Sequence, residues 1–271
     1  MVVNMGQSGS TEGLRWILVD KRADAQRVLH IAEQEDFYLQ ECQEDRANAI
    51  ARSSLTYAPN SMEDADHYRL ILDQALHLIP KRLKMDLGDV MVVPLMPSAE
   101  GGMPHTRPPN LLCFPNTRQL HSTSTLIHEL WHLHQRQYAE LWRALFQQLG
   151  WAEWNGVLPP LLESSRRYNP DTIDSPLWVY RNAWVPLPIF KDSTRPDIKE
   201  IDIWFYHVTN RYHVKTIPSE LASFCPNLPS SAYEHPRELA AYVLAEPDLY
   251  KETPIFQALL KGMGHLAIHY S

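Results

Sequence analysis

The chain has 271 residues, of which 44% are hydrophobic and 21% are charged, proportions typical of a globular protein with a substantial core. Its 25 basic and 32 acidic residues give a formal net charge of −7, which argues against a broad nucleic-acid-binding surface, so no nucleic-acid partner is expected. No apolar run reaches the 18 residues that a membrane-spanning helix needs, so no membrane span is expected.

The three cysteines, Cys42, Cys113 and Cys225, are isolated in the sequence and form no C-x-x-C pair. This spacing indicates free thiols rather than a disulfide framework or a thiolate metal site. The N-terminus also lacks the basic-then-apolar arrangement of a secretion signal. We therefore expect a protein of a reducing compartment, located in the cytoplasm.

The first residues, 1–13, contain Gly and Ser and are expected to form a flexible tail. Residues 24–52 contain no proline or glycine and have partial helical periodicity. A clearer helix is expected from Ser61 to Leu83, where Asp64 follows Ser61 at capping-box spacing and Pro80 closes or kinks the helix.

Two short β-prone runs follow, Val90–Val93 and Leu111–Phe114, each bounded by proline, glycine or asparagine. From Gln119 to Leu149 neither proline nor glycine occurs, and leucines recur at helical spacing until Gly150. Ser122 and its neighbours offer side chains that can cap the start of this helix. The sequence therefore predicts two strands followed by one long helix.

The second half of the chain is rich in proline and aromatic residues. Residues 155–197 have little periodicity, so we expect ordered loops and short helices there. Residues 201–215 are predicted to be a helix, and 237–244 and 254–268 are predicted to be the closing helices. No repeat or linker is visible, which favours one domain over 14–271 with lobes of about 14–150 and 151–271.

The most informative motif is His128-Glu129-Leu130-Trp131-His132, which lies within the predicted long helix. Residues four apart lie on one face of a helix, so the imidazoles of His128 and His132 can bind one ion. Glu129 is positioned to hold a water molecule on that ion without binding it directly. A zinc ion lowers the pKa of such a water, and the carboxylate can then accept its proton.

These residues resemble the longer pattern of the zincin metallopeptidases, because Thr125 stands three residues before His128 and most neighbouring positions are uncharged. His134 departs from the pattern, which usually has an apolar residue there. The resemblance implies an α+β fold, with a small mixed sheet on a long active-site helix and a mainly helical, loop-rich C-terminal lobe. It also implies that Leu111–Phe114 is an edge strand that pairs with an extended peptide substrate.

A catalytic zinc site needs a third protein ligand. The metzincin pattern is absent, since Gln135 and Tyr138 occupy the positions of its glycine and third histidine. The chain instead resembles the gluzincins, which use a glutamate from a later helix. We favour Glu238, in a helix that Pro236 begins. The alternatives are Glu234, Glu163 and Glu153.

The sequence therefore predicts a metallopeptidase that holds Zn²⁺ through His128, His132 and Glu238 and hydrolyses peptide or protein substrates with Glu129 as general base. Two alternatives stay open: a non-catalytic zinc-binding module, and a zinc hydrolase that acts on a non-peptide amide. The donor for the developing oxyanion is left unassigned among Tyr206, His207, Tyr212, His213 and Tyr242.

Overall fold

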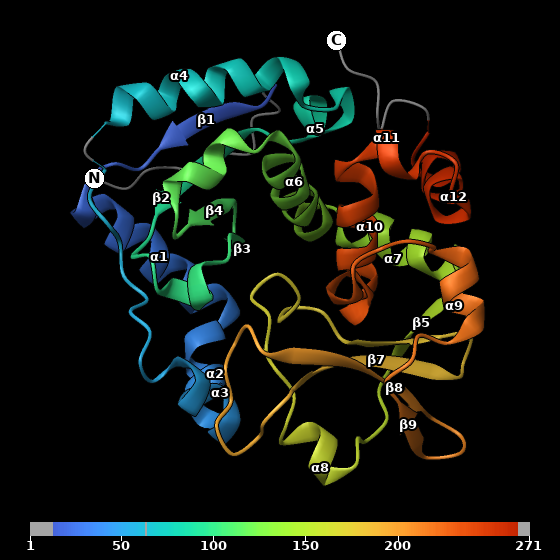
Figure 1. Ribbon diagram of the computed structural model, residues 1–271. Helices are drawn as coiled ribbons and strands as arrows, with labels where there is room; N and C mark the ends of the chain where they lie inside the picture. The colour runs from blue at the N-terminus through green and yellow to red at the C-terminus, as the bar shows by residue number, and fades with distance from the viewer. Residues whose placement is uncertain (1–12, 63, 265–271) are drawn as a thin grey trace.

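Two separate β-sheets organise the computed structural model, which describes residues 13–62 and 64–264. A four-stranded sheet lies in the N-terminal half of the chain and a five-stranded sheet in the C-terminal half (Figure 1). Helices pack against both sheets, so the protein is an α+β protein, as predicted. The predicted tail lies outside the described residues, except for Gly13.

The first sheet has the strand order β1–β2–β4–β3, from β1 (Arg15–Leu18), β2 (Asp89–Pro94), β4 (Leu111–Phe114) and β3 (His105–Arg107). The first three of these strands are parallel and β3 is antiparallel to β4. The sheet is therefore mixed, as predicted. The edge beside β4 is closed by β3, so the prediction that Leu111–Phe114 is an edge strand was wrong.

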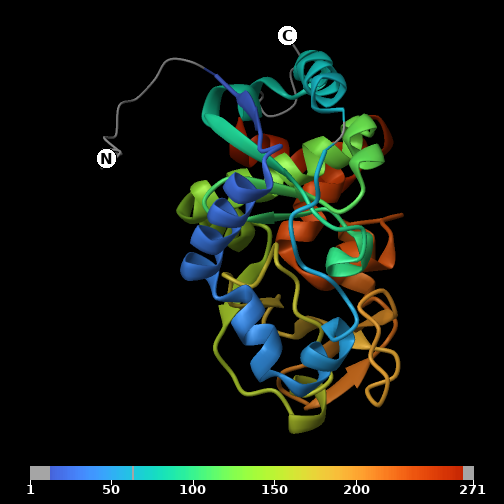
Figure 2. The same cartoon turned by 90° about the vertical axis from the view of Figure 1, so that its left-hand side faces the viewer.

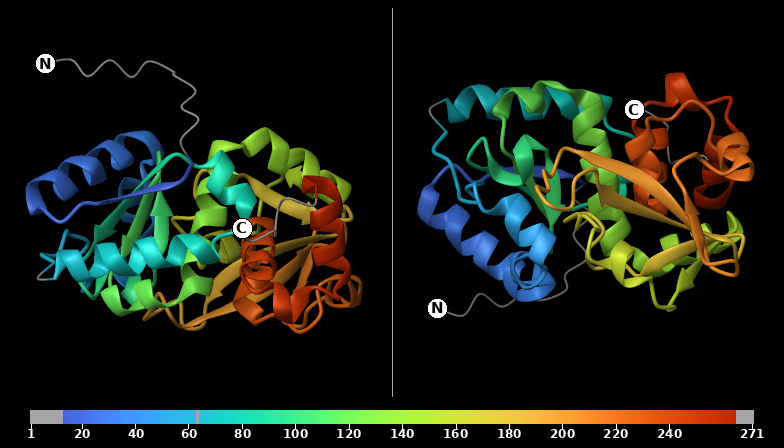
Figure 3. Two further views of the ribbon diagram at one scale, coloured as in Figure 1. Left: turned by 90° about the horizontal axis from the view of Figure 1, so that it is seen from above. Right: turned by 60° about the horizontal axis from the view of Figure 1, so that its bottom comes forward.

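Both faces of this sheet are covered, because alternate side chains of each strand point to opposite sides. Leu112 and Phe114 join the cluster that contains α4 (Ala65–Ala75) and α6 (Thr123–Gln137). Leu111 and Cys113 instead join α1 (Arg22–Asp36). In the left-hand view of Figure 3 the sheet accordingly lies between α1 and the pair α4 and α6.

The helical stretch predicted over 24–52 is divided into α1, α2 (Tyr38–Glu44) and α3 (Arg46–Arg52). The first break is at Phe37, which has a left-handed φ of 52°. The second is at Asp45, whose side chain caps α3 by accepting a hydrogen bond from Asn48 N. These three helices follow one another down one side of the molecule (Figure 2), and α3 packs on Phe190 of the second sheet.

The helix predicted from Ser61 to Leu83 is shorter than expected. It begins as α4 after Asp64, whose side chain accepts from His67 N, and continues as a 3₁₀ turn, Leu76–Leu78. Pro80 then precedes α5 (Lys81–Asp86). Asp64 therefore supplies the cap that Ser61 was expected to supply, because a short side chain directly before the first turn reaches its free N–H groups best.

The helix that carries the motif was predicted to continue to Leu149, and this was wrong. Helix α6 ends at Gln137, Tyr138 leaves helical geometry at φ −116° and ψ 44°, and α7 (Ala139–Gln148) follows. The Tyr138 hydroxyl donates to the Asp86 carbonyl oxygen, 2.9 Å away. This contact holds the chain at the break, and no proline or glycine marks it in the sequence.

The second sheet contradicts the prediction of a mainly helical, loop-rich C-terminal lobe. It is antiparallel, with the order β5 (Trp151–Trp154), β6 (Leu177–Tyr180), β7 (Trp184–Phe190), β8 (Ile201–His207) and β9 (Tyr212–Val214). Residues 201–215, predicted to be a helix, form the β8–β9 hairpin. A short helix, α8 (Pro160–Glu163), lies in the connection from β5 to β6.

Two prolines explain why β7 was not predicted. Pro186 and Pro188 lie inside the strand, where a missing N–H is usually unfavourable. They pair with β8 in an antiparallel ladder, and the carbonyl oxygen of Pro188 accepts a hydrogen bond from Arg167 N on the opposite side. The strand therefore remains paired with β8, although two prolines in the sequence argue against a strand.

The closing helices are α9 (Ser219–Phe224), α10 (Pro236–Ala245), α11 (Pro247–Tyr250) and α12 (Pro254–Met263). The prediction of helices over 237–244 and 254–268 is confirmed up to Met263, and 265–268 lie outside the described residues. Helix α10 lies beside α6 (Figure 1), and both contribute to the largest buried cluster. No helix within the described residues has the length and apolar character needed to cross a membrane.

Candidate metal centre

The motif is presented on the first three turns of α6. Ser122 caps this helix by accepting a hydrogen bond from Thr125 N. His132 and Glu129 are buried, with 0% and 4% of their surface exposed, whereas His128 is only partly buried. The motif therefore lies in the interior of the protein, and His128 is at the border with solvent.

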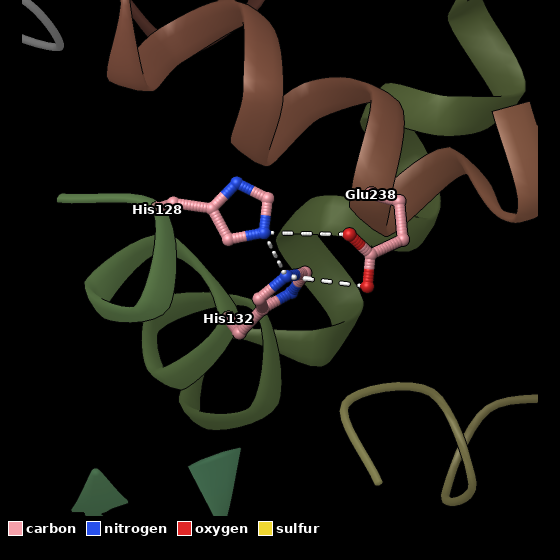
Figure 4. Close-up of side chains that lie close together, drawn as sticks. All are labelled: His128, His132 and Glu238. Atoms are coloured by element: carbon pink, nitrogen blue, oxygen red, sulfur yellow. Dashed lines mark hydrogen bonds and ion pairs between the residues drawn. The ribbon is translucent and has the colours of Figure 1, made fainter. Parts of the chain in front are cut away.

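Glu238 of α10 joins the two histidines, as Figure 4 shows. The Nε2 atoms of His128 and His132 are 3.0 Å apart. The Glu238 carboxylate places Oε2 at 3.3 Å from the first Nε2 and Oε1 at 3.5 Å from the second. Among the described residues, this is the only group of three His, Cys, Asp or Glu side chains close enough to share a metal ion.

The hydrogen bonds of His132 determine which of its nitrogens faces this cluster. Gln135 donates through Nε2 to the Arg237 carbonyl oxygen, so its Oε1 accepts from Nδ1 of His132 at 2.9 Å. In the neutral imidazole, Nε2 then carries no proton, and its lone pair points at Glu238. Acceptor atoms crowded together in this way need a positive charge between them, which a proton or a metal ion supplies.

The electrostatics of the cluster agree with this conclusion. Burial lowers the pKa of His132, but the negative charges of Glu238 and Asp171 outweigh this effect and raise the pKa to about 9. Burial acts to raise the pKa of Glu238, but the imidazoles of His132 and His128 hold it well below its usual value. The carboxylate is thus ionised and attracts positive charge to the cluster.

The distances also fit a small tetrahedral ion. Bonds of about 2.0–2.1 Å in tetrahedral geometry require ligand atoms about 3.3–3.4 Å apart. The observed separations of 3.0, 3.3 and 3.5 Å lie around this value. The cluster could therefore hold a metal ion without large movement of its side chains.

Helix α10 and a neighbouring loop hold Glu238 in place. Pro236 begins the helix and His235 caps it, accepting a hydrogen bond from Arg237 N. Asn169 donates through Nδ2 to Oε1 of Glu238 at 3.0 Å and also to Glu234. This amide restricts the rotation of the carboxylate, as a second layer of contacts does in metal sites.

The three alternative glutamates are engaged elsewhere. Glu153 lies on β5 and pairs with Arg143 at 2.6 Å, and Glu163 ends α8 and pairs with Arg166 at 2.9 Å. Glu234 is closer to the cluster but is paired with the buried Arg167 at 2.5 Å. Of the four candidates, only Glu238 meets the two histidines.

A cavity of about 550 Å³ opens beside the cluster. It is bounded by β3 and the segment before it, by the first turns of α6, by residues 167–171 and by α10. Glu129 lines this cavity, and its buried Oε2 atom has no hydrogen-bond partner among the described residues. Burial raises the pKa of Glu129 well above its usual value, and the neighbouring Asp171 carboxylate raises it further.

Of the five residues considered as oxyanion donors, only Tyr242 lines the cavity. It lies one turn after Glu238 on α10, and its ring packs edge-on against His128 at 4.6 Å between centroids. Tyr206, His207, Tyr212 and His213 lie on β8 and β9, outside the cavity.

Several residues of the site were not identified from the sequence. Gln135, three residues after His132, could have been suspected from its helical spacing. Arg167, Asn169 and Asp171 lie in a connection without regular periodicity, where no pattern distinguishes them from other loop residues.

Comparisons with protein-family models, with curated proteins and with solved structures found no match to this chain. Its chemistry is therefore inferred from its own residues.

Proposed function

We propose that this protein is a zinc-dependent metallopeptidase, with His128, His132 and Glu238 as zinc ligands and Glu129 as general base. The observation that carries the proposal is the meeting of the three acceptor side chains within 3.0–3.5 Å beside a cavity. Two histidines and one glutamate, with a fourth position left for water, are one of the ligand sets of catalytic zinc.

The ligand chemistry favours zinc over harder ions. Calcium and magnesium prefer six or more oxygen ligands, whereas this cluster offers two imidazole nitrogens and one carboxylate. When bound, zinc would lower the pKa of a water molecule and polarise the carbonyl group of the substrate.

The residues of the chain would then divide the work of hydrolysis. Glu129 would accept a proton from the attacking water and deliver it to the leaving amine, a role that its position at the cavity and its unpartnered Oε2 suit. Tyr242 is the phenol placed at the cavity, and its hydroxyl would donate to the oxygen on which negative charge develops. Gln135 would keep the Nε2 lone pair of His132 directed at the zinc.

The location of Glu129 argues against a purely structural zinc site. A structural site fills its fourth position with a protein ligand and needs no nearby base. Here a buried carboxylate with a free oxygen lies on the open side of the cluster. A hydrolase acting on a non-peptide amide would use the same groups, and only a substrate survey separates it from a peptidase.

The variant Glu129→Gln tests the proposal, because it removes the base but keeps the shape of the side chain. We expect it to bind zinc like the wild type and to lose about 10²- to 10⁴-fold in kcat/KM. The measurement is the digestion of a peptide mixture, followed by mass spectrometry, with zinc content determined on the same samples. Equal digestion by the variant and the wild type would refute the role of Glu129, and no digestion by the zinc-loaded wild type would refute the peptidase.

A further inference from the structure

The edge of the first sheet beside the cavity has no free backbone N–H for a substrate. Met103 N donates to the Glu100 carbonyl oxygen, and Pro104 has no N–H. Thr106 N, which points away from β4, donates to Oδ1 of Asp171 at 2.7 Å. An extended peptide therefore finds no backbone N–H donor on β3, whereas the sequence led us to expect edge-strand pairing along Leu111–Phe114.

Asp171 occupies the outward N–H of Thr106 with only one of its two carboxylate oxygens. Oδ1 accepts from both the amide and the hydroxyl of Thr106, at 2.7 and 2.6 Å. Oδ2 accepts no hydrogen bond from any described residue. Asp171 is 6% exposed and lines the cavity, so one carboxylate oxygen of this largely buried side chain remains available to a ligand.

The carboxylate of Asp171 forms no ion pair with any described residue, although its charge acts on Arg237 at longer range. Two neighbouring arginines, Arg136 and Arg237, are both paired with Asp174, at 2.9 and 2.5 Å. Arg237 reaches only the backbone oxygen of Asp171, at 3.1 Å. A buried carboxylate without a cation in direct contact is costly, and a bound cationic group at Oδ2 would compensate it.

Asp171 lies close to Glu129, the proposed base. Both side chains line the cavity, and their negative charges are near enough to interact. A cationic group held by Oδ2 would therefore lie next to the bond that Glu129 helps to hydrolyse.

We infer that Asp171 binds the α-ammonium group of the first residue of a peptide, so that the protein removes single residues from unblocked N-termini. This inference rests on the proposed peptidase function. In the reaction, water adds across the first peptide bond: its hydroxyl group goes to the carbonyl carbon and its proton to the leaving nitrogen. The products are a free amino acid and a peptide shorter by one residue, with a new free N-terminus.

The closed edge favours this assignment over binding of a lysine side chain. A substrate cleaved in the middle of its chain must extend past the reacting bond in both directions, and β3 offers it no backbone N–H donor on the side of Asp171. A substrate that ends in an ammonium group at Asp171 needs no such pairing.

The test compares peptides supplied with free and with acetylated N-termini, using the zinc-loaded full chain. We expect the wild type to prefer the free form by at least about 100-fold in kcat/KM, since loss of a partner from a buried charge pair is costly. Asp171→Asn keeps an oxygen for Thr106 but loses the charge, and should reduce this preference to less than about tenfold at unchanged zinc content. Glu246→Gln, which removes a charge elsewhere on the cavity wall, should keep the preference.

A binding measurement gives a readout that does not depend on turnover. Leucinamide should bind to zinc-loaded Glu129→Gln at least about 30-fold more tightly than N-acetyl-leucinamide, and the double variant with Asp171→Asn should lose the difference. Isothermal titration calorimetry measures both affinities.

Four outcomes would overturn the inference. Equal cleavage of free and acetylated peptides, or release of internal fragments, would refute it and leave the peptidase standing. Cleavage of acetylated peptides only when they begin with lysine would assign Asp171 to a side-chain ammonium group instead. No cleavage of any peptide by the zinc-loaded wild type would refute the proposed function, and the inference with it.

Discussion

The two walls of the cavity beside the candidate metal centre are built in different ways. The helical wall, α6 and α10, places His128, His132 and Glu238 through helical spacing and the packing of two helices. The loop wall, residues 165–175, has little regular structure and places Asn169 and Asp171 through hydrogen bonds. The helical wall therefore suits the binding of an ion, which needs fixed distances between its ligands. The loop wall suits two other tasks, which are to orient the Glu238 carboxylate and to contact a substrate.

The largest effect is expected from the helical wall itself. Glu238→Ala removes one of the three acceptors of the cluster. We expect the zinc content of the purified protein to fall from about one ion per chain to near zero, because two histidines alone bind zinc weakly. Metal analysis of protein purified without added zinc measures this change.

Glu234→Gln is the matched control, because Glu234 lies one turn earlier and is paired with Arg167. It should keep its zinc. If Glu238→Ala retained zinc and Glu234→Gln lost it, the third zinc ligand would be Glu234 and not Glu238.

A smaller effect is expected from Gln135→Ala, which leaves all three ligands in place. Without Gln135 the tautomer of His132 is no longer fixed, and the hydrogen bond to the Arg237 carbonyl oxygen is lost. The affinity for zinc should fall by roughly 10- to 100-fold. Competition with a zinc-binding dye measures it, with the exposed Gln137→Ala on the same helix as control.

The smallest expected effect is on the pH dependence of stability, and it comes from His235, where the loop wall meets the start of α10. His235 caps α10 and contacts the Pro176 carbonyl oxygen, and burial, with the positive charge of Arg237, lowers its pKa to about 3. The unfolded chain takes up this proton near pH 6.5, so between about pH 6.5 and pH 3 it binds more protons than the folded protein. The free energy of unfolding should therefore decrease as the pH falls through this window.

His235→Asn, which retains a capping oxygen, should remove part of this dependence. Between pH 6.5 and pH 5 the wild type should lose about 1.5 kcal/mol more than the variant. Urea denaturation in the presence of a chelator, which removes the effect of metal release, measures the difference. Parallel curves for the two proteins would show that His235 does not titrate on unfolding.

The difference between the walls also explains what could be predicted from the sequence. Helical spacing is local, so the positions of His128, Glu129 and His132 on one helix could be predicted, and Pro236 marked the start of the helix that brings Glu238. The break at Tyr138 could not, because a contact with Asp86 from a distant part of the chain holds it.

The second sheet and the loop wall depend on contacts between distant residues. Strand β7 contains two prolines, and its pairing with β8 is visible only once the chain has folded. Asp171 reaches Thr106, 65 residues earlier, and nothing in the local sequence indicates this contact. The sequence therefore predicted which side chains meet on the helical wall better than the architecture that surrounds them.

The X-ray absorption spectrum of the zinc-loaded protein at the zinc edge tests the central claim most directly. We predict about four nitrogen and oxygen neighbours at about 2.0–2.1 Å, with the outer-shell signal of two imidazoles, which is reduced in His132→Ala. A sulfur neighbour at about 2.3 Å, or a shell of six oxygens without imidazole, would place the ion elsewhere and contradict the account.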